Sequence, residues 1–433
     1  MASSSAFFIF FFFLALSFSI GRAQVPVSET FKFVNEGLSW GGFDEYDSYV
    51  RALDILNPPF QLAFYNTTPN AHTLALLVGN TVQRMPDSYW VWEANRGKPV
   101  GEKATFSLGT DGNLVLAEAN GTVVWQTNTA NKGVVGFKLL PNGNMVLHDS
   151  KGQFVWQSFD YPTDTLLVGQ SLVVGGRNKL VSRASAKENV YGSYSFVLEY
   201  PGFALYYKSK NSPHAARYFT SAKYYSFSVT PNNATFVSVK AFLGYGLFLS
   251  MPGGFDYTFT MLNYNSTYSF IRLGMDGNLR IYTLYTEDDK WGEPQVTFTV
   301  LDRESFWADE CTLPEKCGTF GLCEDNQCVA CPTEKGLLGW SKDCAPKKIT
   351  SCSQKHDVHY YKVEGVEHFL SRYTKGKSPI RAEDCEKKCT KDCKCMGYFY
   401  FEEESKCWIV YDLNTLTKSP NSTHVGYIKV PKE

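Results

Sequence analysis

Two copies of a short segment carry alternating polar side chains that could hydrogen-bond a small ligand. Residues 108–116 read LGTDGNLVL, and residues 139–147, 31 positions further on, read LLPNGNMVL. A glycine and a Trp-Gln pair follow each copy at matching positions. Side chains at every second position of a strand share one face, so these polar groups and a valine would line one surface. The candidate binding residues are Asp111, Asn113, Val115, Asn142, Asn144 and Val146.

A strand, a tight turn and a second strand are the elements that must position these side chains. Apolar residues alternate on both sides of an Asx-Gly turn, in which glycine and asparagine tolerate positive φ. A third hairpin of this kind is predicted within 270–282, around Asp276-Gly-Asn278. Aromatic residues make up 15% of the chain, which suits short strands and many turns. The sequence predicts a mostly β protein, with Trp90, Trp92, Trp125 and Trp156 as core anchors.

Length and charge limit the architecture and the kinds of partner. A chain of 433 residues is too long for one ordinary core, so we expect several domains. The 42 basic and 43 acidic residues nearly cancel, at a formal charge of −1. Such a balance argues against a nucleic-acid-binding or polybasic membrane-binding role.

The N-terminus is typical of a secretory signal peptide. Residues 6–20 are almost entirely apolar, with six phenylalanines before Leu16, and small residues precede a cleavage site after Ala23. The segment lacks the usual preceding Lys or Arg, and a buried helix or a retained anchor is the alternative. No second apolar stretch of about 20 residues follows, so we expect a secreted chain without a membrane anchor.

The cysteines indicate an oxidising compartment. All 12 follow residue 310, and an even, dense set in a secreted chain predicts disulfides. The alternative is zinc, because Cys328-x2-Cys331 and Cys393-x-Cys395 have ligand-like spacing. The residues expected in disulfides are Cys311, Cys317, Cys323, Cys328, Cys331, Cys344, Cys352, Cys385, Cys389, Cys393, Cys395 and Cys407. Spacing leaves their connectivity open.

Five N-glycosylation sequons agree with secretion: Asn66, Asn120, Asn233, Asn265 and Asn421. In the cysteine-rich end, 381–393 predicts a helix with Cys385 and Cys389 on one face, and 425–430 predicts a closing strand.

Several motifs together resemble one plant family. The segments 89–99 (YWVWEANRGKP) and 156–166 (WQSFDYPTDTL), with the two repeats, resemble the bulb-type, mannose-binding lectin module of S-locus glycoproteins and S-domain receptor kinases. Cys311-x5-Cys317-Gly-x4-Cys323 resembles their EGF-like segment. The spacing from Cys385 to Cys395, followed by Cys407-Trp408, resembles their PAN/apple domain. With no kinase behind them, the resemblance is closest to the epidermis-specific secreted glycoproteins, which are curculin-like lectins ending in an apple domain.

The resemblance implies tandem β-prism lectin domains, then a small disulfide-rich segment and an α+β apple domain. The implied parts are a signal peptide at 1–23, a bulb-type lectin domain at 24–169, a second lectin-like, S-locus-glycoprotein-like domain at 170–302, an EGF-like segment at 307–344 and a PAN/apple domain at 352–433. It further implies the pairs Cys385–Cys407 and Cys389–Cys395, which leaves Cys352 with Cys393.

The family pattern for each mannose pocket is Gln-x-Asp-x-Asn-x-Val-x-Tyr, and no copy here is complete. The first copy keeps Asp111, Asn113 and Val115 but has Gly109 and Ala117 at the outer positions. The second copy reads Leu140, Asn142, Asn144, Val146 and His148, and the third reads Gly274, Asp276, Asn278, Arg280 and Tyr282. Two lost hydrogen bonds would weaken binding roughly tenfold to a hundredfold. The alternative is that Asp-Gly-Asn persists because the hairpin needs it.

Other chemistry finds little support. His356-x2-His359 could be a metal pair, and the acidic groups Asp288-Asp289 and 402–404 could serve a glycosidase, but solvated loops and strands explain both. We therefore expect no enzyme activity, no metal and no cofactor.

Two functions are expected as rivals. The first is a secreted lectin-like glycoprotein that weakly binds mannose-type glycans or glycoproteins in the cell wall or apoplast. The second is a structural or protein-interaction glycoprotein that acts through its EGF-like and apple domains. A homodimer is kept open in both.

Overall fold

The computed structural model describes residues 24–42, 44–79, 88–199, 202–221, 238–242, 246–251, 255–261, 268–287, 290–347 and 358–432. Several predicted features lie outside these residues: the signal peptide, Asn233, Asn265, Asp288-Asp289, Cys352 and His356. Among the described residues, no helix is long and apolar enough to cross a membrane.

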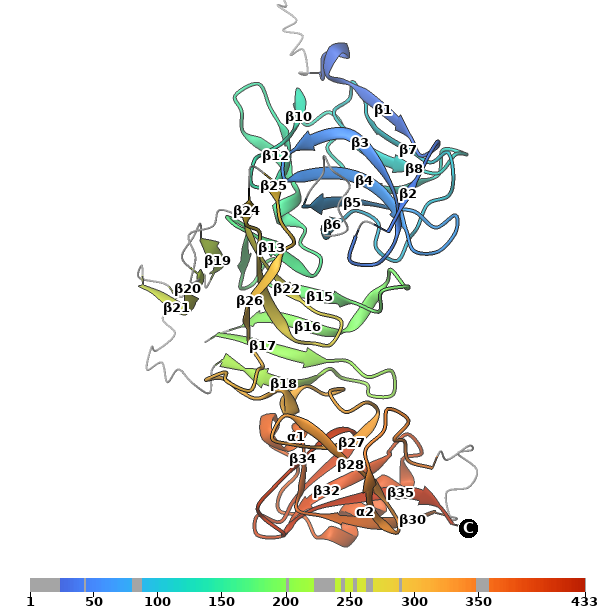
Figure 1. The fold of residues 1–433 in the computed structure, drawn as a ribbon, viewed down its shortest axis with the longest axis vertical. Helices are drawn as coiled ribbons and strands as arrows, with labels where there is room; N and C mark the ends of the chain where they lie inside the picture. The colour runs from blue at the N-terminus through green and yellow to red at the C-terminus, as the bar shows by residue number, and fades with distance from the viewer. Residues whose placement is uncertain are drawn as a thin grey trace, which may run out of the picture.

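Three sheets build the first β-prism, shown in blue and teal in Figure 1. A short 3-10 turn, η1 (Val27–Glu29), precedes them. Their strand orders are β1 (Phe31–Val34), β7 (Thr105–Leu108), β8 (Leu114–Ala117), β9 (Val123–Gln126); β10 (Gly136–Leu139), β11 (Met145–His148), β12 (Phe154–Gln157); and β2 (Trp40–Gly41), β3 (Tyr49–Asn57), β4 (Phe60–Asn66), β5 (Thr73–Val78), β6 (Tyr89–Glu93).

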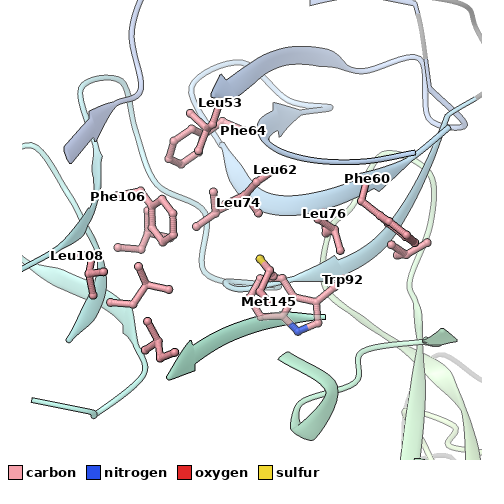
Figure 2. Close-up of a cluster of buried hydrophobic side chains, with 14 of the residues drawn as sticks. Leu53, Phe60, Leu62, Phe64, Leu74, Leu76, Trp92, Phe106, Leu108 and Met145 are labelled. Atoms are coloured by element: carbon pink, nitrogen blue, oxygen red, sulfur yellow. The ribbon is translucent and has the colours of Figure 1, made fainter. Parts of the chain in front are cut away.

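The core of this prism lies where the three sheets face one another. Figure 2 shows Leu62, Phe64, Leu74 and Leu76 from β4 and β5 pointing toward Trp92, Phe106 and Met145 of the other strands. The alternate residues of β4 and β5 are buried too, in a second cluster of Ala63, Tyr65, Ala75, Leu77 and Trp90. Covered on both faces, these two strands read as continuous apolar runs.

Three further sheets build the second prism. Their strand orders are β13 (Thr165–Leu167), β22 (Ser269–Leu273), β23 (Leu279–Thr283), β26 (Gln295–Thr299); β14 (Ser171–Val173), β19 (Ser238–Phe242), β20 (Gly246–Met251), β21 (Phe255–Met261); and β15 (Lys179–Arg183), β16 (Tyr191–Glu199), β17 (Gly202–Tyr207), β18 (Ala216–Thr220). A two-stranded ribbon, β24 (Thr286–Glu287) with β25 (Lys290–Trp291), accompanies them. Because β13 pairs with β22, the chain enters the second prism a few residues before the expected boundary at 169/170.

The cysteine-rich end follows, in orange and red in Figure 1. One sheet has the order β29 (Gly336–Gly339), β28 (Gln327–Thr333), β27 (Phe320–Glu324), β34 (Asn414–Lys418), β31 (Val366–His368), and the other β30 (Val358–Glu364), β35 (His424–Pro431), β32 (Gly397–Phe401), β33 (Lys406–Val410). A 3-10 turn, η4 (Glu310–Thr312), opens the region. β27 and β34 pair in parallel, so the expected EGF-like segment and apple domain share a sheet.

Two helices lie in the same region. α2 (Ala382–Lys391) confirms the predicted helix, with acidic residues in its first turn and lysines in its last, as the helix dipole favours. α1 (Phe369–Tyr373) was not predicted, because five residues are too few for a helical repeat. β35 confirms the predicted closing strand.

The structure confirms the predicted disulfides. Cys385–Cys407 and Cys389–Cys395 are the two pairs that the family resemblance implied, and both cysteines of α2 are fully buried. The pairs that spacing left open are Cys311–Cys323, Cys317–Cys328 and Cys331–Cys344. The zinc alternative is wrong for Cys328, Cys331 and Cys395, since each is bonded to another cysteine. The expected partner of Cys393, Cys352, lies outside the described residues.

The described sequons differ in exposure. Asn120 is exposed in the turn between β8 and β9, and Asn421 is half-buried ahead of β35. Asn66, at the end of β4, is only 9% exposed. Of the three, Asn120 offers the most open acceptor for a glycan.

Candidate functional site

The three Asx-Gly-Asn turns connect adjacent strands, as predicted: β7 to β8, β10 to β11, and β22 to β23. In each turn, the first Asx side chain accepts a hydrogen bond from the backbone N–H two residues later. The acceptors are Asp111 (3.0 Å), Asn142 (3.2 Å) and Asp276 (3.0 Å). The central glycine has positive φ in every copy. At Gly277 a Cβ would also lie 2.6 Å from the ring of Tyr194, so the turn fits only glycine.

The second Asn of each turn is held by hydrogen bonds within the prism. Asn113 donates to Gln126 Oε1 (2.8 Å) and accepts from the N–H of Thr129 (3.1 Å). Asn144 repeats the first of these bonds, donating to Gln157 Oε1 (2.9 Å). Asn278 is fully buried and bonds the backbone of Leu301 in both directions. These amides tie each hairpin to a neighbouring segment of the chain, as expected if Asx-Gly-Asn persists because the hairpin needs it.

The copies differ in what remains exposed. Val146 is fully buried, so its side chain has no surface for a sugar ring. Asp276 of the third copy is engaged by the guanidinium of Arg280 (2.6 and 3.0 Å). The first copy has an exposed carboxylate, Asp111, on a hairpin with a half-buried valine, Val115. Asn142 of the second copy is exposed too, but the valine of its hairpin is buried, so only the first copy combines an open polar group with an accessible valine.

A larger recess lies where the two prisms meet. This inter-prism groove has a volume of about 510 Å³ and is lined from both sides. The first prism supplies Trp92, Trp125 and Tyr161, and the second supplies Arg177 and Tyr191. Tyr161 is 53% exposed and Tyr191 59% exposed, so both side chains are partly open to solvent.

An aromatic stack supports the groove from below. Trp92, Trp125 and Trp156 come from the three different sheets of the first prism and meet edge to face, with ring centroids 5.8–6.3 Å apart. Tyr161 stacks on Trp156 at 5.8 Å, and its carbonyl accepts a hydrogen bond from Trp92 Nε1 (2.9 Å). The sequence prediction of tryptophan core anchors is confirmed for Trp90, Trp92 and Trp156, whereas Trp125 is half-buried at the groove. Stacking on Trp156 orients the Tyr161 ring.

Charged groups border the open rings. Arg177 forms an ion pair with Asp160 (2.5 Å), and its guanidinium lies 5.7 Å from the centre of the Tyr161 ring. Gln157, which receives the Asn144 amide, donates in turn to Asp160 Oδ1 (3.1 Å). The second repeat therefore contributes to this groove indirectly, by orienting one of its acids.

A buried ion network holds the two prisms in register beneath the groove. Arg96 bonds Glu93 (2.7 Å) in its own prism and Asp164 (2.8 Å) at the start of the next. Arg183 of the second prism reaches Glu93 at 3.5 Å, and Arg272 pairs with Glu45 (2.5 Å). All but Glu45 have side chains no more than 6% exposed, so these charges depend on one another.

The network sets the charge states of its members. Burial alone would raise the pKa of Asp164, but Arg96 and Arg272 outweigh it and hold that pKa below its usual value. Burial raises the pKa of Glu45 to about 7, although Arg272 acts in the opposite direction.

The residues of the groove and the ion network lie largely within the two sequence motifs, although the motifs did not predict these contacts. Glu93 and Arg96 lie in 89–99, and Asp160, Tyr161 and Asp164 lie in or beside the motif at 156–166. Charged residues inside aromatic-rich motifs were the available signal, since charges seldom lie among core anchors unless they are paired.

The weaker candidates remain on the surface. His359 lies 3.3 Å from Glu334, and residues 402–404 are exposed in the turn between β32 and β33. Within the described part of the chain, no three His, Cys, Asp or Glu side chains are grouped as a metal site would require.

Comparison with known families matches two parts of the chain. Residues 89–187 match the D-mannose binding lectin family, a range that includes the first two hairpins and most of the inter-prism groove. Residues 352–413 match the PAN-like domain.

Similar proteins cover nearly the whole chain. EP1-like glycoprotein 3 of Arabidopsis thaliana is 47% identical over 436 residues, which span 96% of this chain and 97% of the relative. The epidermis-specific secreted glycoprotein EP1 of Daucus carota is 51% identical over 365 residues, covering 79% and 92%. A G-type lectin S-receptor-like serine/threonine-protein kinase of Arabidopsis thaliana is 25% identical, and only 39% of it is covered.

Proposed function

The chain belongs to the EP1-like glycoproteins, and on that premise we propose that it is a secreted, non-catalytic lectin-like glycoprotein. Its ligands would be mannose-type glycans or glycoproteins of the cell wall or apoplast. The lectin family match, the names of the relatives and the paired cysteines support this proposal.

The inter-prism groove is the observation that carries glycan binding. The apolar face of a sugar ring can pack on an aromatic ring, while charged side chains at its edge bond the hydroxyls. Tyr161 and Tyr191 supply open rings, and Asp160 and Arg177 supply an acceptor and a planar donor beside them. This combination lies at the junction and not at the three hairpins, whose amides are bonded internally.

The first hairpin is a second candidate subsite. Asp111 and Val115 stay accessible, whereas Asn113 would have to exchange its bond to Gln126 for one to a sugar. We expect binding at such a shallow position to be weak unless several sites act together.

A glycan array on the secreted, enzymatically deglycosylated full chain tests this function. The double variant Arg177→Ala, Tyr191→Ala should lose at least tenfold in mannose-type signal, because it removes both a donor to the sugar hydroxyls and a ring on which the sugar packs. Asp111→Ala with Asn113→Ala tests the hairpin, and Tyr49→Ala, which removes a 60% exposed ring elsewhere, is the matched control.

The protein-interaction role is the second candidate function. The internal bonds of Asn113, Asn144 and Asn278 favour it, since they explain the repeats without any ligand. A blank array from well-folded protein would favour this role and direct the search to partners of the cysteine-rich end. Homodimer formation stays a proposal, to be decided by sedimentation of the same sample.

A further inference from the structure

A second recess, in the cysteine-rich end, has a different chemistry. This basic groove has a volume of about 580 Å³ and lies between the segment 377–381 and helix α2. Five of its lining side chains are cationic and one is acidic: Lys377, Arg381, Lys387, Lys388, Lys391 and Asp384. The lining residues include no aromatic ring, in contrast to those of the inter-prism groove.

Helix α2 arranges most of these charges in a row. Positions 381, 384, 388 and 391 recur every three or four residues, so they share one face at spacings of about 5–6 Å. On the adjoining, buried face of the helix, Cys385 and Cys389 are bonded to Cys407 and Cys395. The disulfides thus attach the helix to the underlying sheet and hold the row in place.

The positive charge of the row exceeds what the protein neutralises. Asp384 lies 3.1 Å from Arg381 Nε and 3.8 Å from Lys387 Nζ. Interaction with the neighbouring Lys377 side chain lowers the pKa of the Lys388 ammonium. Like charges held side by side in an open recess attract an anion that can lie between them.

We propose that the basic groove binds an acidic polysaccharide of the polyuronate class, with successive carboxylates meeting successive cations of α2. A linear polymer with a charge on every sugar suits several cations spread along one groove, here Arg381, Lys388 and Lys391, with Asp384 between the first two. Four of the five cations are lysines, whose flexible, hydrated ammonium groups accommodate carboxylates without the fixed geometry of a guanidinium.

Two other classes of polyanion fit less well. Single-stranded nucleic acids gain affinity from stacking on aromatic rings, and the lining residues include none. An anionic membrane surface is flat, whereas these cations surround a recess. The net charge of −1 also leaves the groove as a local feature of a nearly neutral molecule.

Binding of the secreted full chain to immobilised polygalacturonic acid tests the proposal. We expect retention at low salt that weakens at least tenfold by 1 M NaCl, since the screening length falls from about 10 Å at 0.1 M to about 3 Å at 1 M. Lys388→Glu with Lys391→Glu should weaken binding at least tenfold. Lys335→Glu with Lys342→Glu makes the same charge change outside the groove and should have less than a twofold effect.

The proposal would be overturned by no retention of the wild type, by equal retention on the fully methyl-esterified polymer, or by unchanged binding of the Lys388→Glu, Lys391→Glu variant. Tighter binding to polyglutamate or to phosphatidylserine vesicles than to polygalacturonate would also overturn it. If the charge-reversal variant melts early, Lys387→Gln with Lys388→Gln provides the milder comparison. Arg177→Ala with Tyr191→Ala should bind polygalacturonate normally, which separates this site from the inter-prism groove.

Discussion

The two prisms and the cysteine-rich end are stabilised by different means. All 12 cysteines lie after residue 310, so both prisms depend on packed cores and on the buried ions between them. The cysteine-rich end has smaller apolar clusters and five described disulfides.

The difference follows from how the apolar residues are distributed. Three sheets that face one another bury one large apolar cluster in each prism, whereas the cysteine-rich end divides its described buried residues among three smaller clusters, and cross-links then contribute more of its stability. The two regions also present different surfaces. The junction of the two prisms presents aromatic rings, whereas the helix held by disulfides presents several lysines.

Breaking the ion network should have the largest effect. Arg96→Ala leaves Glu93 and Asp164 buried without their shared partner, and we expect a loss of about 3–5 kcal/mol in the free energy of unfolding. Urea denaturation followed by tryptophan fluorescence measures it. Arg280→Ala, which removes a partly exposed ion pair, should cost no more than about 1 kcal/mol. Equal losses in the two variants would show that the network does not hold the prisms.

Removing one disulfide should affect only the cysteine-rich end. Cys389→Ala with Cys395→Ala should cost about 2–5 kcal/mol in that region and cause retention in the secretory pathway. Hydrogen exchange resolved along the chain would locate the loss. An equal loss of protection in both prisms, or normal secretion with unchanged melting, would contradict the claim that disulfides stabilise only the cysteine-rich end.

A smaller change tests the hairpin turns. Gly277→Ala places a Cβ 2.6 Å from the Tyr194 ring at positive φ, and we expect a loss of about 1–3 kcal/mol by thermal melting. Gly121→Ala has nearly the same φ (+86°) but nothing within 4 Å, so it isolates the backbone cost of about 1 kcal/mol. The difference between the two losses in stability should therefore report the steric clash with Tyr194 alone. Identical melting of the two variants would show that this clash costs nothing.

The pH dependence of stability should run in opposite directions in the two regions. Burial raises the pKa of Glu45 to about 7, so the folded first prism binds more protons than the unfolded chain and loses stability as pH rises from about 4.5 to 7. Burial lowers the pKa of His368 to about 3, so the cysteine-rich end loses stability as pH falls from about 6.5 toward 3.

Each slope should reach at most about 1.4 kcal/mol per pH unit. Region-resolved hydrogen exchange at several pH values measures both slopes. Glu45→Gln should flatten only the first. Parallel slopes in the two regions would mean that they unfold as one unit.

Prediction from sequence succeeded where a local pattern determines the structure. The turn at Asp111-Gly-Asn113, the helix carrying Cys385 and the closing strand β35 each follow from a few neighbouring residues. The pairing of Cys389 with Cys395 came from family resemblance.

The remainder depends on contacts between distant segments. The inter-prism groove needs Trp92, Tyr161 and Tyr191 from separate segments of the chain, and no spacing rule brings them together. Whether Asn113 faces a ligand or Gln126 is decided by the neighbouring strand. Five-residue α1 leaves no periodic trace, although His368 caps it by accepting the N–H of Leu370 (3.2 Å).

The parallel pairing of β27 with β34 has a consequence for how such proteins can be shuffled. Phe320 and Asn414 are register partners, so a recombination breakpoint between residues 344 and 352 would cut through one sheet. A chimera made there would carry two unmatched edges, each exposing unpaired backbone groups. The unit that can be exchanged intact begins before Cys311 and runs to the end of β35. We therefore expect the EGF-like segment and the apple domain to be inherited together as one unit.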